Sequence, residues 1–330
     1  MKINEIIKYI LFFIYLNLMN SLFNKINFAN FANLLNKNNN SQNLLHQKII
    51  YLKSKKYIDV YICSNNSDYF IVKENNLSKY TIINKNDTLE TILNKIDFDK
   101  NNLDIFLYNN ILKKNIITIS PGGIYGFYDT GLCSIIKKKY NLKNCIFSGA
   151  SAGAWNSLFM SYKFNINKLI KNIFNINSNK FLSMKKIQLQ LKENILKYHS
   201  NDEFNLKNIY ISVCVFENMS FHNYIYTDFV DLNDVLDCCI ASSNIPFITG
   251  KIICRYNGKI SFDGGFLKNK SILFANPLFN INNSIWGKKK IITSLFGNTN
   301  NIINLHKLYN EGKNDTLKNI KILDKYFYAF

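Results

Sequence analysis

The residues best suited to chemistry in this sequence form a short motif centred on a serine. Residues 149–153 read Gly-Ala-Ser-Ala-Gly, a G-x-S-x-G pattern between an apolar segment that predicts a strand and one that predicts a helix. A serine in such a turn projects from the end of the strand, and Gly149 and Gly153 allow neighbouring elements to approach. The N-terminal end of the next helix favours an alkoxide. We interpret Ser151 as a nucleophile, with a small-residue packing turn as the alternative.

A nucleophilic serine needs a proton acceptor, and the sequence offers two kinds of candidate. Asp263 follows a predicted strand over residues 259–262 and precedes Gly264 and Gly265, so its turn can hold the carboxyl against a neighbouring loop. Asp-Gly-Gly is also common in hairpin turns that carry no chemistry. The other candidates are the histidines, none of which lies in a distinctive local setting: His46, His199, His222 and His306.

A glycine-rich segment, residues 121–126, separates another predicted strand and helix. The N–H groups of Gly122 and Gly123 could bind a developing oxyanion, or equally a phosphate. The dinucleotide-binding fingerprint is excluded because the glycines are adjacent and no acid follows about 20 residues later. A P-loop is excluded because no Gly-Lys-Ser/Thr follows.

These motifs lie in a regular series of predicted elements. Apolar periodicity predicts a strand over residues 116–119, a helix over 126–139, a strand over 145–147 and a helix over 154–160. Alternating strands and helices are typical of parallel sheets covered by helices. We therefore predict a three-layer α/β/α domain with a mostly parallel central sheet.

Taken together, the three motifs resemble the patatin-like phospholipase family, which has a glycine-rich loop, G-x-S-x-G and D-G-G/A in this order. Residues 126–131 and 241–246 also resemble segments of that family, and the similarity covers roughly residues 115–297. Two departures occur. Pro121 stands where the loop usually has its first glycine, and Tyr125 stands where the plant and bacterial branches have a basic residue.

The resemblance implies a patatin-like fold and a lipid acyl hydrolase of the phospholipase A or triacylglycerol lipase type, acting on membrane or lipid-droplet lipids without metal or cofactor. Ser151 would be the nucleophile, Asp263 its proton acceptor, and the Gly122 and Gly123 N–H groups the oxyanion hole. The remaining motif glycines are Gly126, Gly149, Gly153, Gly264 and Gly265. Apolar residues between 163 and 200 are expected to wall the acyl chain, and further candidates for the wall or for the core are Trp155, Phe159 and Phe164.

Two other readings of the same residues stay open. An α/β-hydrolase with a Ser-Asp-His triad would use His306, the only histidine after Asp263. A catalytically inactive lipid-binding homologue would keep the fold without turnover. Specific nucleic-acid binding is not expected despite a net charge of +19, because Arg255 is the only arginine and the lysines are scattered.

The 330 residues, 47% of them hydrophobic, suffice for a large core. We predict a signal peptide or membrane-associating segment at 1–24, based on the apolar run within residues 2–23, and an Asn-rich linker at 25–47. An N-terminal accessory region at 48–114, the catalytic domain at 115–297 and a C-terminal helical extension at 298–330 follow. The segment 2–23 favours membrane association or the secretory pathway, and without that role the chain would be cytoplasmic.

Overall fold

A computed structural model of the protein describes residues 44–53, 55–63, 69–74, 81–84, 114–174, 183–246, 248–250, 253–267, 277–286 and 305–328. The predicted N-terminal segment at 1–24 lies outside the described residues, as does most of the predicted linker. A helix that the sequence predicts over residues 88–96 also lies outside them. Within the described residues, no helix is both long enough and apolar enough to cross a membrane.

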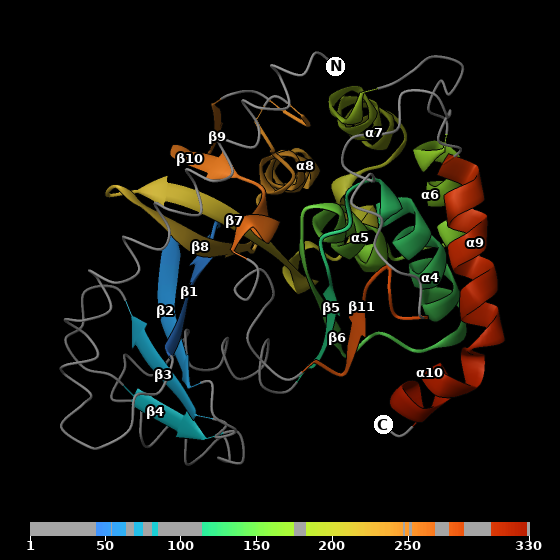
Figure 1. Cartoon of the computed structure of the whole chain (residues 1–330), viewed down its shortest axis with the longest axis horizontal. Helices are drawn as coiled ribbons and strands as arrows, with labels where there is room; N and C mark the ends of the chain where they lie inside the picture. Colours follow the sequence, from blue (N-terminus) through green and yellow to red (C-terminus); the bar gives the residue numbers. More distant parts are fainter. Residues whose placement is uncertain are drawn as a thin grey trace, which may run out of the picture.

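The strands form one mixed sheet in the order β11-β5-β6-β7-β8-β1-β2-β3-β4, with β10 and β9 joined to it through β7 (Figure 1). Strands β11, β5, β6 and β7 run parallel to one another, and β1 runs parallel to β8. The other pairings are antiparallel. The strand bounds are β1 Leu44–Tyr51, β2 Lys56–Cys63, β3 Tyr69–Glu74, β4 Thr81–Asn84, β5 Asn115–Ile119, β6 Cys145–Ala150, β7 Ile209–Glu217, β8 Ser220–Thr227, β9 Cys254–Tyr256, β10 Lys259–Phe262 and β11 Phe279–Ile281.

The centre of the sheet consists of apolar strands that are covered on both faces. Every residue of β6 is buried, as are the last four residues of β5 and the first seven of β7. Continuous burial of this kind is typical of parallel strands in α/β proteins. Strands β5 and β6 confirm the two strands that the apolar segments predicted.

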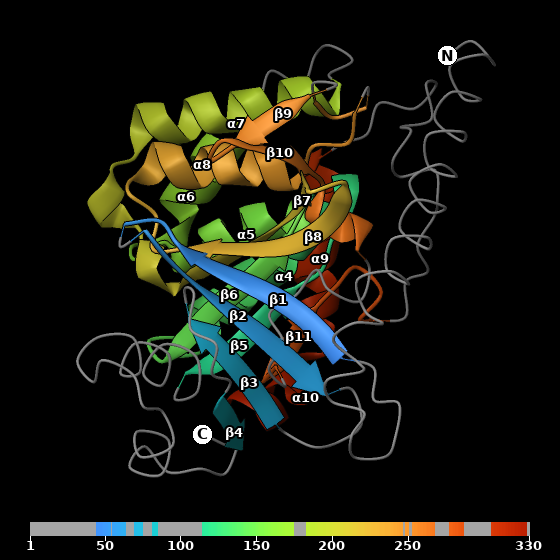
Figure 2. The ribbon, with the colours of Figure 1, turned by 90° about the vertical axis from the view of Figure 1, so that its left-hand side faces the viewer.

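The helices are α4 Gly126–Lys139, α5 Ala152–Ser161, α6 Ile166–Ile173, α7 Met184–Tyr198, α8 Leu232–Ser242, α9 Leu305–Lys318 and α10 Ile320–Phe327. Helices α4, α5 and α8 pack on the sheet, and α6, α7 and α9 pack on these inner helices. In Figure 2, strands β1 to β3 and β8 lie in front of α4, α5 and α9. The predicted α/β class is confirmed, and the arrangement is consistent with three layers.

Helix α9 fixes α4, which carries the loop of residues 121–126, through a close backbone crossing. A Cβ on Gly131 would lie 2.2 Å from the Tyr309 carbonyl oxygen, and one on Gly312 would lie 2.0 Å from the Tyr128 carbonyl oxygen. The Tyr128 hydroxyl also donates to Asp315 over 2.9 Å. Residues from the predicted C-terminal extension therefore support the segment that holds the glycine-rich loop.

The region at 48–114 contributes strands to the main sheet. Lys48–Tyr51 pair in parallel with Tyr224–Thr227 of β8, and β2, β3 and β4 continue the sheet from β1. Residues 49–51 and 57–63, whose apolar and β-branched runs are typical of strands, lie in β1 and β2, and β1 begins at Leu44, inside the predicted linker.

Candidate active site

Ser151 occupies the turn between β6 and α5. It adopts φ 55° and ψ −123°, which is uncommon for a residue with a side chain, and α5 begins at the next residue. The side chain therefore leaves the end of a buried strand at the N-terminus of a helix, as the motif predicts. Ser151 is 7% exposed.

The two flanking glycines are required because backbone atoms approach them closely. A Cβ on Gly149 would lie 2.2 Å from the Gly153 carbonyl oxygen, and a Cβ on Gly153 would lie 2.0 Å from the Ile119 carbonyl oxygen. Neither contact leaves room for a side chain. The pattern G-x-S-x-G thus reflects the packing of the turn against itself and against β5.

A second serine holds the backbone of the turn. The Ser151 N–H donates to the Ser242 Oγ over 2.8 Å, and the Ser242 hydroxyl donates to the Ser212 carbonyl oxygen over 2.7 Å. Ser242 is fully buried in the last turn of α8. Ser242 thus links the strained turn to strand β7, and the Ser151 N–H is used in the hydrogen bond that holds this turn in place.

Asp263 reaches Ser151 through the register of three strands. Ala150 of β6 is level with Ser212 of β7, and Phe262 of β10 is level with Cys214 of β7. Continuing that register brings Gly264 opposite Ser212. A Cβ added to Gly264 would lie 2.2 Å from the Ser212 carbonyl oxygen and 3.0 Å from the Ala150 Cβ. Asp263, which precedes Gly264, therefore lies beside Ser151, which follows Ala150.

The Asp263 carboxyl accepts a hydrogen bond from the Gly265 N–H over 2.7 Å, and it lies close enough to the Ser151 side chain for that hydroxyl to lower its pKa. Its own N–H donates to the Asn244 carbonyl oxygen over 2.8 Å. Asp263 is only 6% exposed, and this burial raises the pKa of its carboxyl from 3.8 to about 6. The interactions of the carboxyl with Ser151 and with the Gly265 N–H oppose part of that rise. A carboxylate with this pKa is ionised at neutral pH and is more basic than an ordinary aspartate.

The glycine-rich loop lies over the same site. Gly123 has φ 55° and begins a short 3-10 turn that ends at Tyr125. Gly123 and Ser151 line one cavity, whereas Gly122 lies beside Asp129, whose Oδ2 would be 3.3 Å from an added Cβ. A Cβ on Gly265 would lie 2.9 Å from the Pro121 Cγ, so the proline packs against the Asp-Gly-Gly turn.

Gly126 joins this loop to the helix that follows Ser151. A Cβ on Gly126 would lie 2.7 Å from the Ala152 Cβ. The Gly126 carbonyl oxygen accepts from Thr130 Oγ1 over 2.8 Å and from Asn156 Nδ2 over 2.9 Å. Thr130 also donates to Asn156 over 2.9 Å, which ties α4 to α5.

Beside Ser151 lies a cavity that encloses about 800 Å³ of space, part of it open to solvent. Helix α5 contributes Trp155 and Phe159 to its wall, and α6 contributes Ile173. Helix α7 contributes Met184, Ile187, Gln188, Leu191 and Ile195. Among the described residues that line the cavity none is charged.

Several polar side chains in the cavity wall are hydrogen-bonded to other groups of the protein. Thr130 and Asn156 form the pair described above, and Trp155 Nε1 donates to Ser243 Oγ over 3.1 Å. The Thr249 hydroxyl accepts from the Ile245 N–H over 2.7 Å. The space therefore offers an apolar surface to a ligand. Of the predicted wall residues Trp155 and Phe159 line it, but Phe164 does not and is 58% exposed.

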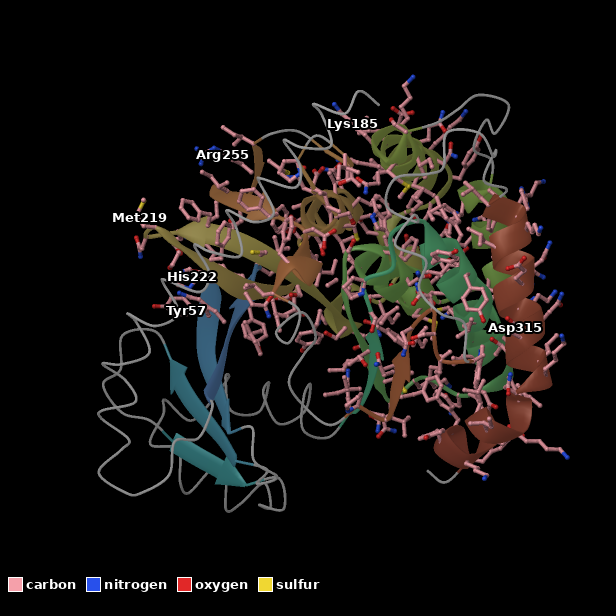
Figure 3. All side chains as sticks on the ribbon, in the orientation of Figure 1. Tyr57, Lys185, Met219, His222, Arg255 and Asp315 are labelled. Carbon is pink, nitrogen blue, oxygen red and sulfur yellow. The ribbon has the colours of Figure 1, made fainter. Side chains whose placement is uncertain are left out.

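The described histidines engage other groups. His306 is exposed on α9, and its ring centroid lies 4.5 Å from that of Phe174. His199 contacts Asn172 and Glu203. His222, labelled near β8 at the left of Figure 3, contacts Ser220. The side chain of His46 lies outside the described residues.

Sequence analysis did not identify Ser242 or Asn244 as parts of this arrangement, although the predicted wall between residues 163 and 200 does include the cavity-lining residues of α6 and α7. Ser242 and Asn244 lie in the segment 241–246, which resembles a segment of the patatin-like family, but that resemblance predicts no role for either residue. Their contacts with Ser151 and Asp263 depend on the return of α8 to the end of β7. No local pattern in the sequence encodes that return.

A scan against models of known protein families found no match, and a search of curated protein sequences found no significant relative.

Proposed function

We propose that this protein is a lipid acyl hydrolase of the patatin-like phospholipase type, which cleaves carboxylic esters through a Ser151–Asp263 dyad. The observation that carries the proposal is the proximity of the Ser151 side chain, in its strained turn, to the buried Asp263 carboxyl, beside a cavity whose described lining residues are uncharged and mostly apolar. A strained nucleophile turn, a carboxylate with raised basicity and a glycine loop on the same cavity are the parts that acyl transfer requires.

In the proposed reaction, the ionised Asp263 takes the hydroxyl proton of Ser151 as the serine oxygen attacks the ester carbonyl. The N–H groups of the Gly122–Gly123 loop stabilise the tetrahedral oxyanion. Collapse breaks the bond to the alcohol, which leaves with the proton from Asp263, and the acyl group remains on Ser151. Water then attacks the acyl-enzyme and gives a proton to Asp263. Collapse of the second tetrahedral intermediate breaks the bond to the Ser151 oxygen, which takes the proton back from Asp263 as the fatty acid leaves.

The cavity supports a long apolar acyl group as the part of the substrate that is bound. Its wall can bury methylene groups without leaving a charge unpaired. Esters of membrane or storage lipids have this chemistry. The family assignment rests on the order and context of the three motifs.

The proposal is tested by labelling the whole chain with a fluorophosphonate probe and by identifying the products of lipid hydrolysis by mass. Wild type and Ser200→Ala, which alters an exposed serine, should be labelled and should release fatty acid; Ser151→Ala should do neither. Labelling that survives in Ser151→Ala would refute the assigned nucleophile. Lipid binding by folded wild type without labelling or product would indicate the inactive lipid-binding alternative.

The observations favour the dyad over a Ser-Asp-His triad. The His306 ring lies against that of Phe174, whereas the described side-chain neighbour that acts on Asp263 is Ser151. His306→Ala should therefore keep the hydrolysis rate within about threefold, well below the hundredfold or greater loss typical of a removed general base. A loss as large as that of Ser151→Ala would establish the triad instead.

A further inference from the structure

Helix α7 has two faces with different surroundings. Its inner face lines the cavity beside Ser151. Its outer face carries Leu189 and Leu196, which are 44% and 40% exposed. These leucines are seven residues apart, close to two helical turns, so they lie on one side of the helix. Among the described elements, none covers this pair.

Exposed lysines surround the two leucines. Lys185, Lys186 and Lys197 lie on the same outer face, and α7 runs along the upper edge of the molecule in Figures 1 and 2. Figure 3 labels Lys185 at this edge. The outer face of α7 is therefore both basic and apolar.

The fraction of lysine is higher in α6, in α7 and in the residues next to them than in the chain as a whole. Residues 163–174 and 183–198 contain seven lysines in 28 residues and one acid, Glu193, whereas the whole chain has 41 basic residues in 330. Two of the seven are paired with acids of other elements, Lys168 with Glu203 and Lys192 with Asp237. The remaining five are exposed and outnumber the single acid, so α6 and α7 present a positive surface.

We propose that the outer face of α7, together with the exposed lysines of α6, docks on an anionic membrane. Leu189 and Leu196 enter the interface between headgroups and acyl chains, and the lysines contact lipid phosphates. Exposed leucines among lysines fit a lipid surface better than a nucleic acid, whose backbone offers phosphates but no apolar layer. The chain also has a single arginine with which to read bases.

This placement joins the membrane to the cavity through one helix. The opposite face of α7 forms the cavity wall, so a docked molecule holds the site one helix away from the bilayer. The delivery of substrate by this route rests on the proposed function. Membrane binding itself does not, because it depends only on the surface of α6 and α7.

The test is binding of the full chain, carrying Ser151→Ala to prevent hydrolysis, to vesicles of phosphatidylcholine alone or mixed with phosphatidylserine. A triple variant Lys185→Gln, Lys186→Gln and Lys197→Gln should lower affinity for the anionic vesicles by roughly 100-fold, at about fivefold per lysine. Leu189→Ser with Leu196→Ser should weaken binding to both kinds of vesicle. The matched control is Lys318→Gln, Lys321→Gln and Lys325→Gln on α9 and α10, which should stay within about twofold of the parent.

The proposal would be overturned by absence of vesicle binding by the parent, by equal losses in the α7 and control triples, or by an α7 triple that binds as the parent does. Duplex DNA binding that weakens in parallel with vesicle binding in the lysine triple, with no effect of the leucine changes, would also overturn it. Intact thermal unfolding of each variant excludes loss of fold as the cause. Wild type that binds vesicles through α7 but releases no fatty acid would overturn the proposed function alone.

Discussion

Replacing Asp263 by asparagine should abolish ester hydrolysis and at the same time stabilise the fold at neutral pH. The carboxyl is buried, and none of the described residues that line the adjoining cavity is charged. Its ionised form is therefore less well solvated in the folded chain than in the unfolded chain, despite its interactions with Ser151 and with the Gly265 N–H. Asparagine has the same shape and carries no charge, so it removes this cost together with the base.

The magnitude follows from the pKa of Asp263, which folding raises from 3.8 to about 6. A rise of roughly two units corresponds to about 3 kcal/mol. For an acid whose pKa is raised in the folded state, the favourable contribution of protonation is present below pH 3.8 and is lost as pH rises to about 6. Asp263→Asn should therefore be more stable than wild type by up to about 3 kcal/mol above pH 6 and equally stable below pH 3.8.

Urea unfolding of both chains at the two ends of this pH range measures the difference, and other titrating groups cancel in the comparison. Asp202→Asn, at an exposed carboxyl, serves as the control and should show no comparable gain. Hydrolysis by Asp263→Asn should fall by about 10²–10⁴-fold, the usual loss for a removed general base. A stability difference that does not change with pH, or hydrolysis that persists in Asp263→Asn, would refute the assignment of a buried, basic carboxylate.

Further predictions concern the same turn. The rate of hydrolysis at subsaturating ester should fall about tenfold per pH unit below pH 6, as Asp263 becomes protonated, and should level off above it; a profile without this inflection contradicts the base. Ser242→Ala removes the acceptor of the Ser151 N–H, so kcat should fall by about 10–100-fold with little change in KM, and Ser242→Thr should restore part of it. An equal loss in both variants would indicate a packing role. Gly149→Ala should destabilise the chain by about 3 kcal/mol or more in urea unfolding because of the 2.2 Å approach to Gly153, whereas Gly258→Ala, with φ 74° and open space, should cost about 1 kcal/mol; similar values would contradict the packing argument.

The local parts of the site were predictable from the sequence because each one is encoded within a few residues. The turn at Ser151 needs glycines at both sides for contacts made inside the turn and with β5, and the pattern G-x-S-x-G records that need directly. The helix predicted over 126–139 is α4, with the same bounds. The strand over 259–262 is β10, and Asp263 follows it as predicted.

The parts that could not be predicted depend on contacts between distant segments. Ser242 and Asn244 hold Ser151 and Asp263 through hydrogen bonds that span 91 and 19 residues, and nothing near either residue marks it as a support. Parallel pairing of β1 with β8 joins the region before residue 114 to the main sheet, although short β-type runs suit an accessory unit equally well. The apolar residues between 163 and 200 were predicted to wall the acyl chain, but their spacing fits any amphipathic helix and could not single out α7.

The hydrogen bonds from Ser242 and Asn244 act on the two residues of the site whose conformation or burial costs the most free energy. Ser151 has a strained backbone at φ 55°, and Asp263 is a carboxylate buried beside an uncharged cavity; features of this kind cost of order 1–3 kcal/mol each. Both lie at the ends of strands joined to β7, so the sheet fixes their separation before any side chain is considered. The hydroxyl of Ser242 and the carbonyl of Asn244, two residues apart at the end of α8, then hold the two backbones by hydrogen bonds. Because one short segment restrains both partners, a change that moves the end of α8 should weaken the contact between them even when Ser151 and Asp263 are intact.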